Sequence, residues 1–363
     1  MAIMQSRHQM IEEDIKEKIL TGQFEVEEKL PTESELMKEY DAGRSTVRRA
    51  IGDLENKNFV YRIQGSGMFV NNWKSSNQRQ TKKSPIIGVI TTYIGDYIFP
   101  RIINGIDQVI SEKRYTLLLA NTHNDPERER RELITLLDNN VSGLIIEPTQ
   151  SNLESPNIDL YEQMKKFKIP AVFINAKYPN VDSYSITTND KSGVRKLTSY
   201  LMSQGHKRIL GVFQVDDHQG TGRMLGYIQA YQEHASIDFE NNILMYQSND
   251  NSKKVLNRIK EHLSSVNPPT AIVCYNDQLA ISVINMIKSM GLSIPEDVSI
   301  TGFDDYEISK YISPSITTMT HAKEQMGLDA ANLLVKLMEG EKGESIVYEP
   351  EIVVRDSVKR IED

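Results

Sequence analysis

The stretch Arg44-Ser45-Thr46-Val47-Arg48-Arg49-Ala50-Ile51 determines how the first seventy residues are interpreted. It opens a predicted helix from about Ser45 to Asn56, in which Val47, Ile51 and Leu54 recur on one face. Short hydroxyl groups and arginines at the start of a helix can reach phosphates and guanine edges when that helix enters a major groove. The stretch therefore predicts a helix that contacts DNA.

Two further helices are predicted before this one. Apolar residues recur at close to helical spacing over Met10–Leu20, and Gly22 follows the last of them. The segment Pro31-Thr32-Glu33-Ser34-Glu35-Leu36 opens a second helix. Thr32 followed three residues later by Glu35 is the pattern of a capping box, which marks a helix start.

A β-hairpin is predicted after the three helices. The strands Phe59–Gln64 and Met68–Val70 are joined by the turn Gly65-Ser66-Gly67. Three helices followed by a hairpin are typical of a winged helix-turn-helix domain, here over residues 1–70. The alternative is a small α+β subdomain with no role in DNA binding.

The charge is distributed unevenly along the chain. The 363 residues hold 42 Lys and Arg against 50 Asp and Glu, a net charge of −8. Residues 44–83 alone hold nine bases against two acids. A basic segment in an acidic chain is typical of a small nucleic-acid module attached to a larger regulatory body, although a solvated basic face has the same composition.

Residues 71–84 predict a linker between domains. The segment is polar, contains four bases and no acid, and shows no periodicity. We expect it to behave as a flexible coil.

From Pro85 to the end of the chain, short apolar runs alternate with amphipathic stretches of helical length. The predicted strands are Ile86–Ile90, Tyr115–Ala120, Gly143–Ile146, Ala171–Ile174, Ile209–Phe213, Ala271–Cys274 and Val298–Gly302. The predicted helices include Ile102–Glu112, Glu127–Leu137, Gly193–Met202 and Leu279–Met290. Continuous apolar strands bounded by helices indicate an α/β fold with parallel sheets covered on both faces. The length favours two similar lobes over residues 85–363.

Polar and aromatic residues follow several of these strands, where ligands bind in parallel α/β folds. They are Tyr93, Asp96, Tyr97, Phe99, Glu147, Asn175, Asp216, Asp217, His218, Tyr275, Asn276, Asp277, Asp304 and Asp305. Aromatic faces beside planar hydrogen-bonding groups suit a polyhydroxy ligand. The alternative is that such residues cap the following helices. We expect capping for Asp277 and Asp305, and ligand contact for Arg223 and Asn276.

The three motifs of the N-terminal region together resemble the DNA-binding domain of the GntR family of bacterial regulators. They are Pro31–Leu36, Arg44–Ile51 and Gln64–Val70. The resemblance implies that operator double-stranded DNA is the partner. The residues that it places against DNA are Arg44, Ser45, Thr46, Arg48, Arg49, Gly65, Ser66 and Gly67.

Residues 85–363 resemble the sugar-sensing core of the LacI/GalR family, which has a periplasmic-binding-protein fold. The motifs are Gly220–Tyr227, Cys274–Ala280, Ile294–Asp305 and Ser315–Met319. The resemblance implies effector contacts at Phe99, Asn175, Asp217, Arg223, Asn276, Asp304 and His321, to which we add Glu147 on its chemistry. The segments Thr91–Pro100 and Ile146–Thr149 are similar to those of arabinose-responsive members, which makes L-arabinose the expected effector.

Together these features predict a sugar-responsive repressor that acts as a homodimer, without catalytic residues, cofactor or metal site. An enzyme carrying an accessory DNA-binding module is the alternative, because Gly220-x-Gly222-x-x-x-Gly226 superficially resembles a dinucleotide fingerprint. Its third glycine is one position late, and the usual acidic partner is missing. A repressor of the same design that senses another sugar also remains open. The lack of a long apolar run, the acidic residues near the N-terminus and the single Cys274 predict a cytoplasmic protein with no membrane association.

Overall fold

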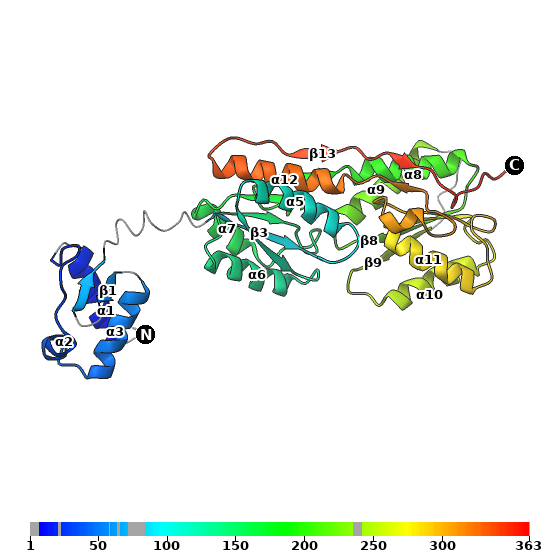
Figure 1. Cartoon of the computed structure of the whole chain (residues 1–363). Helices are drawn as coiled ribbons and strands as arrows, with labels where there is room; N and C mark the ends of the chain where they lie inside the picture. The colour runs from blue at the N-terminus through cyan, green and yellow to red at the C-terminus, as the bar shows by residue number, and fades with distance from the viewer. Residues whose placement is uncertain are drawn as a thin grey trace. The chain divides into compact units, whose positions relative to one another are not determined.

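The computed structural model describes residues 7–20, 23–57, 59–63, 66–71, 84–234 and 242–362. The chain divides into two compact units, Met1–Ser84 and Pro85–Asp363, which we call the N-terminal unit and the C-terminal unit (Figure 1). Gly65 of the predicted wing and residues 72–83 of the predicted linker lie outside the described residues.

The N-terminal unit has the winged-helix order predicted from the sequence. Its elements are α1 (Arg7–Leu20), α2 (Glu33–Glu39), α3 (Arg44–Asn56), β1 (Val60–Ile63) and β2 (Gly67–Val70). Its core consists mainly of buried aliphatic side chains, among them Ile11, Ile15, Leu36, Val47, Ile51 and Leu54.

The predicted capping box is confirmed at the start of α2. The backbone N–H of Glu35 donates to the Thr32 hydroxyl at 3.3 Å, and the backbone N–H of Thr32 donates to the Glu35 carboxylate at 2.7 Å. This reciprocal pair satisfies two backbone donors that a helix start otherwise leaves without partners.

The C-terminal unit contains two parallel sheets, as predicted. The sheet of the larger lobe has the order β13-β7-β6-β5-β3-β4, and the sheet of the smaller lobe has the order β11-β10-β8-β9. The strands of the larger lobe are β3 (Ile86–Thr91), β4 (Thr116–Asn121), β5 (Gly143–Ile146), β6 (Ala171–Asn175), β7 (Tyr184–Thr188) and β13 (Ile346–Tyr348). Those of the smaller lobe are β8 (Ile209–Gln214), β9 (Ile243–Tyr246), β10 (Ala271–Cys274) and β11 (Ser299–Thr301).

Helices cover both faces of each sheet, which explains why most of the strands are apolar. In the larger lobe, α5 (Phe99–Glu112) and α12 (Lys323–Met338) pack on one face, and α6 (Pro126–Asp138) and α7 (Ile158–Lys166) on the other (Figure 1). In the smaller lobe, α8 (Asp190–Ser203) and α9 (His218–Glu233) lie opposite α10 (Ser252–Leu263) and α11 (Asp277–Ser289). In the part of the chain that the structure describes, no helix has the length and apolar character needed to cross a bilayer.

The two lobes are not consecutive in the chain. The backbone passes between them at Asn189, at residues 320–322 and at residues 349–351, so that α12 and β13 complete the larger lobe. A short antiparallel pair, β12 (Thr318–Met319) with β14 (Ile352–Val353), borders the last two passages. Gly327 lets α12 approach α5 closely, because a Cβ atom there would lie 2.1 Å from the Ile102 carbonyl oxygen.

Candidate functional site

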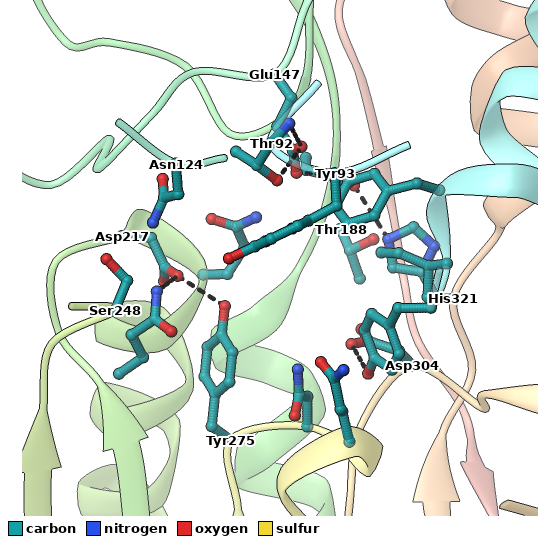
Figure 2. Close-up of a pocket in the computed structure, with 18 of the residues that line it drawn as sticks. Thr92, Tyr93, Asn124, Glu147, Thr188, Asp217, Ser248, Tyr275, Asp304 and His321 are labelled. Carbon is teal, nitrogen blue, oxygen red and sulfur yellow. Dashed lines mark hydrogen bonds between the residues drawn. The ribbon is translucent and has the colours of Figure 1, made fainter. Parts of the chain in front are cut away.

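A cavity of about 270 Å³ lies where the carboxyl ends of the two sheets face each other. It is lined by Thr92, Tyr93, Asp96, Tyr97, Ile98, Phe99, Asn124, Glu147, Pro148, Asn175, Thr188, Asp190, Gln214, Asp217, Gln219, Ser248, Tyr275, Asn276, Gln278, Asp304 and His321. Figure 2 shows polar side chains from both lobes converging on this space. The position agrees with the rule that ligands bind at the carboxyl ends of parallel strands.

Glu147 forms the polar wall of the larger lobe. Its carboxylate accepts hydrogen bonds from the backbone N–H and hydroxyl of Thr92, at 2.9 and 2.7 Å, and from the amide of Asn175 at 2.8 Å (Figure 2). Burial raises the pKa of Glu147, and these hydrogen bonds oppose the shift. The carboxylate is thus fixed in one orientation at the end of β5.

Aromatic rings stand beside Glu147. The rings of Tyr93 and Phe99 lie 5.9 Å apart, centroid to centroid, and both line the cavity. Tyr93 is partly exposed, whereas Phe99 is buried at the start of α5. Such faces can stack against the C–H groups of a sugar ring.

Asp217 and Tyr275 form the wall of the smaller lobe. Asp217 caps α9 by accepting from the backbone N–H of Gly220 at 2.6 Å, and it also accepts from the Tyr275 hydroxyl at 2.7 Å (Figure 2). Asn276 likewise caps α11 through the backbone N–H of Leu279 while lining the cavity. Capping and ligand contact, which we treated as alternatives, are therefore compatible at these two residues.

Arg223, for which we expected ligand contact, is not among the lining residues and lies directly behind three of them, Asp190, Tyr275 and Asp304. Its Nε donates to Asp190 at 2.8 Å, its Nη2 to Asp304 at 3.1 Å, and its Nη1 to the Tyr275 carbonyl at 2.7 Å. The guanidinium also stacks 3.8 Å from the centroid of the Phe303 ring. Arg223 is 3% exposed. Three of the five N–H donors of its guanidinium pair with protein groups, and two of these bonds hold cavity carboxylates in place.

The two carboxylates held by Arg223 respond differently to burial. Burial raises the pKa of Asp190 to about 7, although Arg223 opposes the shift. Burial also acts on Asp304, but there the charge of Arg223, assisted by the Tyr97 hydrogen bond and Lys323, prevails and lowers the pKa of Asp304 below its ordinary value. At neutral pH Asp304 is the main counterion of the arginine.

His321 presents an unsatisfied acceptor at the edge of the cavity. Its Nε2 lies 3.2 Å from the Asn175 amide oxygen, which can only accept, so Nε2 carries the proton. Its buried Nδ1 has no hydrogen-bond partner among the described residues. Burial lowers the pKa of His321 to about 4, so the ring is neutral at physiological pH and Nδ1 can accept a hydroxyl proton.

Direct contacts join the lobes on two sides of the cavity. The Tyr97 hydroxyl donates to Asp304 at 2.5 Å. Elsewhere, the backbone N–H of His218 donates to the Ser151 hydroxyl at 3.0 Å, and Asn152 donates to the Val215 carbonyl at 3.0 Å. These contacts exist only while the lobes are close together.

The structure brings together seven of the eight residues that we expected around the effector. They are Phe99, Glu147, Asn175, Asp217, Asn276, Asp304 and His321, and Arg223 is the exception described above. Asp277, expected to be a cap, accepts from the Thr318 hydroxyl and the Tyr306 backbone N–H, at 2.7 Å each, and ties two segments together.

Our sequence-based site omitted several lining residues. The most informative are Asp190, Thr188, Gln214 and Ser248. Thr188 and Ser248 end or follow β7 and β9, two strands that we did not predict. Gln214 ends β8, which we did predict, so the strand-end rule applied to it directly. Asp190 is the first residue of α8, and no feature of the sequence marked it as a site residue.

We expect Asp217 to make stability depend on pH. Burial raises the pKa of Asp217 from 3.8 to about 6, with hydrogen bonds from Tyr275 and Gly220 opposing the shift. Between these values the unfolded chain loses a proton that the folded chain keeps, so this contribution is complete below pH 3.8 and is lost as the pH rises through about 6. Relative to an Asp217→Asn variant, the wild type should lose about 1 kcal/mol of unfolding free energy between pH 5 and pH 7.5.

Urea unfolding at the two pH values measures this difference. A Gln278→Ala variant, which removes a neutral lining side chain, is the control and should differ from the wild type equally at both pH values. An Asp217→Asn variant that behaves like this control would show that Asp217 is ionised throughout the range.

In the N-terminal unit, the first turn of α3 presents an exposed basic surface. The side chains of Arg44 and Arg48 are 73% and 61% exposed, and each lies near the Glu33 carboxylate, at 3.5 and 3.6 Å. Such exposed ion pairs are weak, so Glu33 does not hold either arginine firmly. Ser45 and Arg49 are also exposed, and Thr46 is half-buried.

The described part of the predicted wing lies on the exposed surface. Ser66 and Gly67 are exposed, and Gly67 has a φ of +118°, a conformation that favours glycine. A Cβ atom at this position would also come within 2.8 Å of the Lys29 side chain.

Comparison with known proteins matches both units. Residues 7–70 match the family described as bacterial regulatory proteins, gntR family, and residues 198–358 match a periplasmic binding protein-like domain. The chain is 41% identical to the arabinose metabolism transcriptional repressor of Geobacillus stearothermophilus and 38% identical to that of Halalkalibacterium halodurans. Both alignments cover 98% of this chain. They cover 98% of the Geobacillus protein and 97% of the Halalkalibacterium protein.

Among solved structures, the transcription regulator CcpA of Lactococcus lactis is similar, with a TM-score of 0.68 and 26% identity. It covers 76% of this chain and all of that chain. A winged DNA-binding unit joined to a two-lobed core with an interlobe cavity defines a ligand-responsive transcription regulator. The chain belongs to the same family as the two arabinose metabolism transcriptional repressors, and it is a repressor rather than an enzyme.

Proposed function

We propose that this repressor controls genes for the use of a small sugar and leaves its operator when that sugar occupies the interlobe cavity. The observation that carries the proposal is the lining of the cavity, in which carboxylates and amides from both lobes surround a space beside two aromatic rings. The names of the two relatives support L-arabinose as the sugar.

The chemistry of the wall fits a polyhydroxy ligand. Glu147, Asp217 and Asp304 offer acceptors for hydroxyl protons, and Nδ1 of His321 is a further acceptor without a described partner. Phe99 and Tyr93 can stack on the ring. Each buried polar group that pairs with a hydroxyl removes a desolvation penalty, which makes binding specific.

The operator would be bound by α3 and the wing. Arg44, Ser45, Thr46, Arg48 and Arg49 lie in the first half of α3, where a recognition helix contacts bases and phosphates. Ser66 and Gly67 would contact DNA beside them, and Gly65 belongs to the same proposed contact. We further propose that the chain acts in the cytoplasm as a homodimer, which places two recognition helices on two half-sites.

Sugar binding would act by stabilising the closed arrangement of the lobes. A ligand that contacts both lobes binds the closed form more tightly, and only this difference in affinity can shift the population. The hydrogen bond between Tyr97 and Asp304, and that between Ser151 and His218, form in the closed arrangement and would be lost on opening.

Thermal unfolding of the full chain with a panel of pentoses and hexoses tests the proposal. At a concentration one hundred times its dissociation constant, L-arabinose should stabilise the protein by about 2.7 kcal/mol. The same sugar should release a labelled operator in an anisotropy assay. A stronger shift with another pentose would replace L-arabinose as the effector, whereas no shift with any sugar would contradict the proposed function.

A further inference from the structure

The charged groups that line the interlobe cavity are almost all acidic. Glu147, Asp190, Asp217 and Asp304 line it and are each at most 9% exposed. We call these four residues the carboxylate ring. Asp217 and Asp304 follow strands of the smaller lobe, and Asp190 begins α8 in the same lobe. Glu147 follows a strand of the larger lobe, so the ring includes groups from both walls of the cavity. Among the described lining residues there is no lysine or arginine.

Cations near the ring do not reverse its charge. Arg223 is shared between Asp190 and Asp304 and is occupied on its third side by the Tyr275 carbonyl. Lys323 donates to the backbone carbonyls of Asp304 and Asp305 and does not line the cavity. Two cations, Arg223 and Lys323, therefore lie behind four carboxyl groups.

His321 adds no positive charge, because its ring is neutral at physiological pH. The repulsion within the ring is visible in its members. After burial, the negative charges of Asp304 and Asp217 raise the pKa of Asp190, and that of Asp217 raises the pKa of Glu147. A ligand that brought another negative charge would meet the same repulsion in a site screened poorly by water.

We propose that the carboxylate ring makes this cavity reject anionic sugars, so that the repressor senses its effector only before the sugar is phosphorylated or oxidised to an acid. The inference rests on the proposed function and specifies the charge of the ligand. A neutral sugar donates hydroxyl protons to the same carboxylates and gains from them, whereas a phosphate or carboxylate group brings acceptors and charge that they cannot pair.

If anions are rejected, the sugar acts as effector only until a reaction gives it a negative charge. The step that ends it is a phosphoryl transfer to the sugar, or an oxidation that produces a sugar acid. Isomerisation or reduction leaves the molecule neutral and does not end the signal through charge. Accumulated sugar phosphate would therefore leave the operator occupied, and repression would return as soon as the free sugar had been consumed.

Isothermal titration of the full chain at pH 7.5 tests the inference. The ligands are L-arabinose, L-arabinose 5-phosphate and L-arabinonate. We expect both anions to bind at least 100-fold more weakly than the free sugar. An anion that binds within tenfold of the sugar overturns the inference.

Variants separate charge from size. In a Glu147→Gln/Asp217→Asn variant, two negative charges are replaced by amides of the same shape, and the ratio of anion to sugar affinity should rise at least tenfold. The Gln278→Ala variant removes a neutral lining group and should leave this ratio unchanged. An unchanged ratio in the double variant, with L-arabinose still bound, shows that size rejects the anions and overturns the assignment to the carboxylate ring.

The experiment also distinguishes failure of the inference from failure of the proposed function. If L-arabinose binds and the anions bind equally well, only the charge selection is wrong. If an anion binds and no neutral sugar does, both are wrong. If no member of the panel binds, the proposed function is wrong and the inference falls with it.

Discussion

Replacing Arg223 with alanine should lower the free energy of unfolding of the C-terminal unit by about 3–5 kcal/mol. Arg223 and its partners Asp190 and Asp304 are all at least nine-tenths buried. Without the guanidinium, the two carboxylates would share a buried site with no counterion between them. Removing one member of a buried ion pair leaves charge that neither water nor protein compensates, which is why the expected loss is large.

Urea unfolding of the full chain measures this effect, and Arg195→Ala is the matched control. Arg195 also joins α8 to α9, through Glu233 at 3.2 Å, but this pair is partly exposed and should contribute no more than about 1 kcal/mol. Equal losses in the two variants would contradict the assignment of Arg223 as the residue that holds the cavity carboxylates.

The same variant should lose its response to sugar under conditions in which it remains folded. Asp190 and Asp304 line the cavity, so their displacement alters the binding surface. Both residues belong to the C-terminal unit, and the N-terminal unit keeps its sequence and its own core. Operator binding in the absence of sugar should persist while release by L-arabinose is lost. Loss of operator binding by the folded variant would instead assign Arg223 to dimer formation.

Replacing Arg48 with alanine should weaken operator binding by about 1–3 kcal/mol and leave sugar affinity unchanged. The side chain of Arg48 is exposed on α3, whereas those of Val47 and Ile51 are buried. Its guanidinium can pair with a guanine edge through two hydrogen bonds, and its removal also loses one positive charge near the phosphates.

Fluorescence anisotropy with the operator and with a scrambled duplex measures both contributions. An Arg48→Lys variant is the control, because it keeps the charge and loses the bidentate fork. We expect Lys to retain binding to the scrambled duplex and to lose preference for the operator. Wild-type operator affinity in Arg48→Ala would show that Arg48 is an exposed side chain that makes no contact with DNA.

Much of the fold could be predicted because its signals are local. The capping box at Thr32 and Glu35 and the apolar strands at β5 and β10 follow from neighbouring residues alone, and each prediction matched the structure. By contrast, β7 was missed because Tyr184-Ser185-Ile186-Thr187-Thr188 is largely polar. It is a strand because it pairs with β6 on one side and with β13 on the other, and the residues of β13 lie about 160 positions further along the chain.

The same division applies to the candidate site. Neighbouring residues alone indicated that Glu147, Asn175 and Asn276 end or follow strands of parallel sheets, and this placed them at carboxyl ends of strands, where they line the cavity. The partners of Arg223, by contrast, depend on the tertiary fold. Asp190 and Asp304 reach the guanidinium from segments 33 and 81 residues away, and they accept two of the hydrogen bonds that it can donate. A buried arginine needs partners within the protein, because leaving its charge unpaired away from water costs several kcal/mol. Those partners come from distant parts of the chain, so neighbouring residues do not reveal them.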